Sequence, residues 1–323
     1  MLKKLSSPWP LLLIFAGALL NGCAASSVFN TSEPKPESSS SLQGRDSSTV
    51  YSAPKQIGTI TNAQLTEISG LAPSRINKGI WWVHNDSGDQ ARLYALNNKG
   101  QLLAKYNVKG AKNVDWEDLA SGPGGEGKSA LYIADIGNNS LSRGELVIYR
   151  VSEPHLAQTA PKTVLNGETA AAEAFPFRYP SGKHDAEALF VDPQSGRPYL
   201  VTKKMAPPCA VYRFPLPLQP GKTVTLEKVT GKAVEAIAQL ALVTGATASP
   251  DGKRVAIRTY FTAIELARTG GRFESVFNAE PLTIKLPLER QGEAISYTAD
   301  GKALVTTSER LPAPFFQLVR SGR

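Results

Sequence analysis

Short apolar runs separated by clusters of turn residues occupy the chain from about residue 55 to its end. The runs are rich in Val, Ile, Leu, Tyr and Phe, and Gly, Pro, Asp and Asn gather between them. This pattern is typical of β-strands, whereas an amphipathic helix needs apolar positions every three to four residues over a longer window. We interpret 233–242 as a helical turn or an irregular insertion. The sequence therefore predicts an all-β domain.

One strand–turn–strand pattern occurs five times in this region. In the copy that shows it most clearly, 184–190 reads as a strand, 192–196 as a tight turn and 198–203 as the returning strand. The copies begin near residues 67, 117, 187, 246 and 293. Self-similarity at this scale is the mark of a repeat architecture.

Each copy extends to further strands, and their number predicts a closed ring. Third strands are predicted at 92–96, 145–149, 210–214, 262–266 and 315–319, and fourth strands at 102–108, 174–179, 224–229 and 282–286. The last copy has no fourth strand, but an unpaired strand, 56–61, precedes the first copy. If that strand completes the last blade, no sheet edge stays exposed. We predict a five-bladed β-propeller over residues 55–323, closed by the N-terminal strand; six blades are the alternative, because one wide interval could hold a degenerate copy.

The N-terminus reads as a lipoprotein signal peptide over residues 1–22. Lys3 and Lys4 precede an apolar stretch, 11–20, that is too short to span a bilayer as a mature helix. The stretch ends in Leu-Asn-Gly-Cys, which resembles the bacterial lipobox, so we predict acylation of Cys23 by chains such as palmitate. An ordinary secretory signal is the alternative.

Acylation at Cys23 predicts a cell-envelope protein held at the membrane surface without a spanning helix. Residue 24 is Ala rather than Asp, which favours the outer membrane, with the folded part facing the periplasm. Residues 23–54 are rich in Ser and Pro and poor in large apolar residues, so we expect a flexible tether there.

Composition narrows the possible partners. The chain has 323 residues, 41% of them hydrophobic and 20% charged, which is ordinary for a soluble globular protein. The net charge is +8, but no basic run or basic–aromatic interleaving occurs, so no nucleic-acid partner is predicted. A lipidated Cys23 leaves Cys209 without a partner, which excludes a disulfide or a cysteine metal site within one chain. We expect a monomer.

Residues 122–129 match the P-loop pattern, Gly-x-x-x-x-Gly-Lys-Ser. Phosphate binding by this motif needs a helix after it, so that backbone amides and the helix dipole meet the phosphates. The residues that follow, 130–134, read as a strand instead. We therefore predict a hairpin turn and no nucleotide site.

In a propeller blade, the start of the first strand and the end of the second lie on one face, around the central channel. Four copies carry a glutamate that we place at the same repeat position, and the fourth copy has Ala246 there with the Thr247 hydroxyl beside it. The predicted metal ligands are Glu67, Glu117, Glu187, Glu293 and Thr247.

Converging carboxylates raise one another's pKa, and a bound cation removes that repulsion. Oxygen ligands without cysteine favour Ca²⁺, which accepts six to eight ligands. The alternative is architectural: each glutamate bonds the backbone amides of a neighbouring blade, or pairs with Lys203 or Arg258.

Polar residues near the same strand ends are the predicted contacts of a small-molecule or protein ligand. They are His84, Asp86, Asp135, Asn138, His184, Asp185, Lys203, Arg258, Tyr260 and Glu309. The Asn- and Gly-rich loops among them serve equally well as turns. No Ser-His-Asp arrangement can be read from the spacing.

These motifs resemble exported bacterial β-propellers of the SdiA-regulated type. The resemblance rests on 67–71 with 83–88, on 115–120 and on 184–189, and it covers nearly all of 55–320. More distantly, the repeat glutamates are similar to those of calcium-activated nucleotidases of the apyrase type, which are five-bladed and hold a central Ca²⁺. That resemblance implies a fold and a metal more than an activity.

We therefore expect a lipid-anchored binding or scaffold domain with Ca²⁺ at its channel mouth. The rival is a metal-dependent hydrolase of phosphoesters or phosphoanhydrides, with lactones as a variant substrate. In the rival, Asp86, Asp135 and His184 lie near the metal, while Lys203 and Arg258 hold phosphate. Whether these two cations face an open metal site discriminates between the hypotheses.

Overall fold

The computed structural model describes residues 45–46, 50–157 and 163–321. The predicted signal peptide, Cys23 and most of the predicted tether lie outside these residues. Within the described part, no helix is both long enough and apolar enough to cross a membrane.

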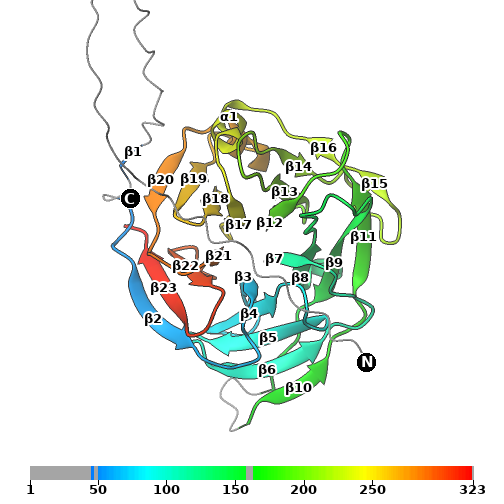
Figure 1. The fold of residues 1–323 in the computed structure, drawn as a ribbon, viewed down its shortest axis with the longest axis vertical. Coiled ribbons are helices and arrows are strands. Elements are labelled where there is room, and N and C mark those ends of the chain that lie inside the picture. The colour runs from blue at the N-terminus through cyan, green and yellow to red at the C-terminus, as the bar shows by residue number, and fades with distance from the viewer. Residues whose placement is uncertain (1–44, 47–49, 158–162, 322–323) are drawn as a thin grey trace, which may run out of the picture. The chain divides into compact units, whose positions relative to one another are not determined.

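Five β-sheets surround a common axis, as predicted (Figure 1). Blade 1 consists of β3 (Ile68–Pro73), β4 (Ile80–Asn85), β5 (Arg92–Asn97) and β6 (Leu102–Asn107). Blade 2 consists of β7 (Trp116–Pro123), β8 (Ser129–Asp135), β9 (Leu146–Ser152) and β11 (Glu173–Arg178). Blade 3 consists of β12 (Ala186–Val191), β13 (Pro198–Thr202), β14 (Val211–Arg213) and β16 (Glu227–Lys228).

The last two blades complete the ring. Blade 4 consists of β17 (Val243–Ala248), β18 (Arg254–Thr259), β19 (Thr262–Ala267) and β20 (Leu282–Lys285). Blade 5 consists of β21 (Gly292–Tyr297), β22 (Ala303–Ser308), β23 (Ala313–Val319) and the N-terminal strand β2 (Lys55–Ile60). The first strands β3, β7, β12, β17 and β21 pack side by side around the axis. The six-bladed alternative is wrong.

Three short strands were not predicted as separate elements. β10 (Leu165–Glu168), β15 (Val224–Thr225) and β1 (Arg45–Asp46) each add a parallel edge strand, to β6, β11 and β20 respectively. The predicted fourth strand 224–229 is therefore divided between two blades. Its first part joins blade 2 as β15 and its second part joins blade 3 as β16.

The core lies between neighbouring blades, which explains the burial pattern of the strands. First and second strands such as β3, β4, β12 and β13 are buried along their whole length, whereas the outer strand β2 is largely exposed. Five apolar clusters fill the five seams. In one of them Phe190 and Tyr199 stack at 5.0 Å between ring centroids. The helix α1 (Lys232–Ala238), near the predicted helical turn, and the 3₁₀ helix η3 (Phe273–Asn278) cover this seam.

The P-loop-like segment forms the turn of the β7–β8 hairpin, as predicted. β7 ends at Pro123, the 3₁₀ turn η2 covers Gly125–Gly127, and β8 begins at Ser129. The Gly124 amide donates to the Lys128 carbonyl at 2.7 Å. A strand and not a helix follows, so the motif lacks the geometry that phosphate binding requires.

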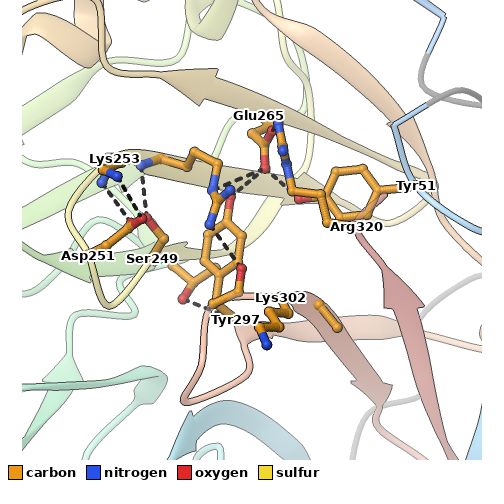
Figure 2. A network of polar contacts seen from close by, with 12 residues as sticks. Tyr51, Ser249, Asp251, Lys253, Glu265, Tyr297, Lys302 and Arg320 are labelled. Atoms are coloured by element: carbon orange, nitrogen blue, oxygen red, sulfur yellow. Dashed lines mark hydrogen bonds and ion pairs between the residues drawn. The ribbon is translucent and has the colours of Figure 1, made fainter. Parts of the chain in front are cut away.

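Both ends of the described chain meet at the seam between blades 4 and 5. β2 pairs with β23, and ahead of it Tyr51 forms a bridge with Arg320 and is buried. Figure 2 shows Tyr51 and Tyr297 converging on Glu265, to whose carboxylate both phenols donate. The folded part therefore begins before residue 55, where we had placed the boundary, because Tyr51 buries its ring against this seam.

Candidate functional site

A β-bulge near the start of every first strand positions the side chains of the channel mouth. The pairing register shifts between Ile68 and Gly70, and at the equivalent places in the other four blades. A bulge turns a side chain away from its regular direction. The residues in the bulges are Ser69, Glu117, Glu187, Thr244 and Glu293.

This register shows that two of the predicted metal ligands do not occupy the bulge position. Glu67 precedes the bulge of blade 1 by two residues and is exposed. Thr247 lies three residues beyond the bulge of blade 4 and faces a cavity at the other end of the channel. Comparison of the five repeats assigned both residues to the wrong position. In these two blades Ser69 and Thr244, rather than glutamates, occupy the bulges.

The bulge residues divide into two chemical groups. The hydroxyls of Ser69 and Thr244 donate to backbone carbonyls of the next blade, those of Glu117 and Gly292, so they stabilise the ring. The three glutamates receive no hydrogen bond from a backbone amide among the described residues, and the buried Oε2 of Glu293 has no partner there at all. The architectural alternative therefore describes the two hydroxyls and, among the glutamates, Glu187, which pairs with Lys203 at 2.7 Å.

Three carboxylates at the mouth lie close enough to share one cation. Asp86, Asp115 and Glu117 each offer an oxygen, and these oxygens lie within 4.8 Å of one another. Asp86 follows β4, Asp115 precedes β7, and Glu117 is in the bulge of β7. Gly137 leaves the space that two of them need, because a Cβ there would collide with Glu117 Oε1 and with Asp115 Oδ2.

Burial makes ionisation of this cluster costly. It raises the pKa of Asp86 to about 7, with the neighbouring Asp115 adding to the effect. Burial also raises the pKa of Asp115, and it raises that of Glu117 well above its ordinary value, with Glu187 and Asp86 contributing. Such a cluster gains most from a cation, which compensates the charges that water no longer solvates.

The opposite side of the mouth contains a carboxylate–lysine network. Lys203 Nζ lies 2.7 Å from Glu187 Oε1 and donates to the Tyr260 hydroxyl at 3.3 Å. Burial alone would lower the pKa of Lys203, but Glu187 and Glu293 outweigh it and raise the pKa. Burial raises the pKa of Glu187 to about 8 and that of Glu309 to about 9. The predicted residues Lys203, Tyr260 and Glu309 thus lie at the mouth.

Arg258 does not face the mouth, so its predicted ligand role is wrong. Its guanidinium pairs with Glu289 at 2.9 Å, and both side chains have no exposed surface. It also donates to the Ala294 carbonyl at 2.8 Å. The guanidinium lies in the wall between blades 4 and 5, since it bonds to the first strand of blade 5 rather than pointing along the channel.

His84 is likewise a core residue and not a ligand-binding residue. Its ring is fully buried, lies edge-on to Trp116 at 5.4 Å and has its Nδ1 3.0 Å from the Asn85 carbonyl oxygen. Burial lowers the pKa of His84 to about 4, so the ring is neutral at pH 7. Gly70 makes room for it, because a Cβ at that position would collide with the imidazole.

The remaining predicted residues organise the loops beside the metal cluster. Asp135 pairs with Arg143 at 2.7 Å and accepts the Asp115 amide at 3.1 Å, which fixes the backbone of one cluster residue. Asp185 accepts the Asn138 amide at 2.7 Å. The His184 ring is 3.0 Å from the Ser181 hydroxyl, outside the carboxylate cluster.

Two contributors were absent from the predicted site. Asp115 is in the Asp-Trp-Glu-Asp motif, so its proximity to Glu117 was a usable signal. Asn113 donates to the Asp86 carbonyl at 2.8 Å and accepts the Trp116 amide at 3.3 Å, which holds the two sides of the cluster together. No sequence pattern singles out Asn113.

Asp118 reaches across the axis and links three blades. Its Oδ1 accepts the Leu119 amide at 2.8 Å, and its Oδ2 accepts the amides of Leu189 at 2.8 Å and Ala246 at 3.0 Å. The carboxylate thus connects β7 to β12 and β17 directly beside the bulge that carries Glu117. It fixes the position of the candidate metal ligand next to it.

Comparisons with known proteins do not identify a family for this chain. No protein-family model matches the chain, and a search of curated proteins found no match either. Among solved structures, the glutaminyl cyclase of Myxococcus xanthus is 11% identical over 83% of this chain and 97% of that chain, with a TM-score of 0.44. A likeness at this level carries no inference about activity. The five-bladed assignment rests on the strand pairing described above.

Proposed function

We propose that the protein is a membrane-anchored binding domain that holds Ca²⁺ at its channel mouth. The observation that carries the proposal is the cluster of Asp86, Asp115 and Glu117, whose oxygens lie within 4.8 Å of one another. All three donors are carboxylates, and such hard oxygen ligands favour Ca²⁺ over softer metal ions. Water molecules complete the coordination of the ion. The anchor is Cys23, at the outer membrane facing the periplasm. Labelled palmitate entering the wild-type protein but not Cys23→Ser tests that part.

The hydrolase hypothesis receives less support from the site. Phosphate would need cations facing the metal, but Arg258 is buried against Glu289 and Lys203 pairs with Glu187. A binding role fits the surroundings better. Exposed large apolar side chains lie, along the sequence, within a few residues of residues at or beside the mouth, and such side chains mark interaction surfaces where they gather. They are Val114, Leu141, Met205 and Phe261.

Calorimetric titration of metal-free protein with Ca²⁺ tests the metal site. We expect saturable binding by the wild type and at least a tenfold loss in Glu117→Gln, because one of three carboxylates is removed. In Glu187→Gln the loss should be smaller, since that residue pairs with Lys203. Glu235→Gln, on α1, is the matched control and should bind like the wild type. Absence of Ca²⁺ binding by the wild type would refute the proposal, and a preference for Mg²⁺ would correct the ion.

The metal-free protein should lose stability as the pH rises from 6 to 9. The folded-state pKa values of Asp86, Glu187 and Glu309 are raised to about 7, 8 and 9, above ordinary values near 4. A raised pKa contributes stability that is fully present below the unfolded value, near 4, and is lost as the pH rises from there through the folded value. Saturating Ca²⁺ should reduce this loss. Thermal unfolding with a chelator or with Ca²⁺ measures both effects. Equal melting temperatures of the metal-free protein at pH 6 and pH 9 would contradict the expectation.

A further inference from the structure

A cavity opens at the end of the channel opposite the carboxylate cluster. Its volume is about 230 Å³, and the ends of all five first strands or the turns that follow them contribute to its wall. The lining residues used below are Arg75, Ala120, Ser121, Val191, Thr247 and Pro250. Asp118 bridges blades 2, 3 and 4 between this cavity and the metal cluster. We propose that this cavity is a binding site for a small organic monoanion, a carboxylate with a short apolar body.

The charge at this end is opposite to that at the mouth. The lining contains no aspartate or glutamate, and it contains one arginine. The guanidinium of Arg75 makes no hydrogen bond or ion pair with any residue in the described ranges. Its backbone amide, by contrast, donates to Glu153 at 3.2 Å, which fixes the turn that carries it. The Arg75 side chain is exposed at the rim, and a guanidinium without a carboxylate partner can make a bidentate contact with an anion.

Two hydroxyls inside the cavity offer further donors. Thr247 Oγ1 accepts the Tyr297 amide at 3.4 Å, so its own proton remains free to donate. The Ser121 hydroxyl forms no hydrogen bond with the part of the chain that the structure describes. A third hydroxyl, that of Ser296, donates to the Tyr297 carbonyl at 3.3 Å, and most of the other lining side chains are apolar, such as Ala120 and Pro250. A mostly apolar cavity with a few convergent donors is the usual form of a small-molecule site.

Volume limits the size of the ligand. The cavity volume of about 230 Å³ is below the range of drug-sized pockets, which begins at about 300 Å³, so the cavity suits a ligand smaller than a drug molecule. Hexanoate, a six-carbon carboxylate, matches this size and presents the anionic and apolar parts that the lining offers.

Titration of the full chain with hexanoate, in the presence of a chelator, tests the inference. We expect saturable binding, observed by calorimetry and by ligand-detected NMR, and at least tenfold weaker binding of the uncharged hexanamide. Arg75→Gln should weaken hexanoate binding at least tenfold. Lys78→Gln is the matched control, because it removes one positive charge from the same turn without touching the cavity. Thr247→Val, which keeps the side-chain volume, should weaken binding by a few-fold.

Three results that do not involve the mouth would overturn the inference. They are no hexanoate binding by the wild type, equal binding of hexanoate and hexanamide, and unchanged binding by Arg75→Gln. The outcome is separable from the calcium proposal, because Glu117→Gln should lose Ca²⁺ binding and still bind hexanoate. If Glu117→Gln lost hexanoate binding while its melting temperature stayed unchanged, the anion site would be at the mouth and the inference would be wrong.

Discussion

Replacing Arg258 with methionine is expected to lower the free energy of unfolding by about 3–5 kcal/mol. The guanidinium and the Glu289 carboxylate pair at 2.9 Å with no exposed surface on either side chain. Removal of the cation leaves a buried carboxylate whose remaining partner is the Thr306 hydroxyl at 2.9 Å. The uncompensated charge, more than the lost attraction, causes the destabilisation. Urea unfolding followed by tryptophan fluorescence measures it.

Two further variants separate this cause from the simple loss of a salt bridge. Arg258→Met combined with Glu289→Met removes both charges, so much of the lost stability should return. Arg213→Met is the matched control, since Arg213 pairs with Glu227 at 2.8 Å while the two side chains are 33% and 47% exposed. Its cost should stay below about 1 kcal/mol. Equal losses of unfolding free energy in Arg258→Met and Arg213→Met would show that burial of the Arg258–Glu289 pair does not increase the destabilisation.

Asp118→Ala is expected to cost about 3–5 kcal/mol of unfolding free energy, because it leaves three buried backbone amides without an acceptor. Leu119, Leu189 and Ala246 donate those amides from three different blades. Asp118→Asn should cost less, since one oxygen can still accept. The loss should also weaken Ca²⁺ binding, because the bulge carrying Glu117 adjoins Asp118. Chemical unfolding and calorimetry on the same variants measure the two effects.

The control for this prediction is a buried aspartate with only local partners. Asp192 accepts the Gln194 amide at 3.0 Å and the Ser195 hydroxyl at 2.5 Å, both within its own turn. Asp192→Ala should therefore cost about 1 kcal/mol and leave Ca²⁺ binding unchanged. If Asp118→Ala costs no more than this control, the link between blades is not a major source of stability.

The fold could be predicted because its signals repeat. Five copies of one pattern give the number of blades, and a strand missing at one end but extra at the other indicates how the ring closes. The P-loop match could be rejected for the same reason. Residues 130–134 are one copy of the second strand of the repeated pattern, and every blade has such a strand. Tyr51 was missed because a single buried aromatic in a polar segment makes no repeating pattern.

The site could be predicted only in part, because bulges break the alternation of side chains along a strand. Glu117, Glu187 and Glu293 occupy the same bulge position in their blades. Glu67 is also a glutamate, but it lies two residues before the bulge of its own blade. His84 and Arg258 lie near strand ends that do face the mouth, yet their side chains point into the core. The partner of Arg258 is a loop residue, Glu289, and the sequence contains no signal that connects the two.

The closing of blade 5 by both ends of the ring has a consequence for synthesis. β2 pairs with β23, and just ahead of β2 the Ser52 hydroxyl accepts the Val319 amide, which is 267 positions later in the sequence. β2 therefore leaves the ribosome long before its partner β23 is synthesised. Until then β2 has an unpaired edge, which invites pairing with other chains. Contacts this distant in sequence form slowly, because loop closure must precede them. We expect ring closure to be the last folding step and the stage at which the nascent protein is most prone to aggregate.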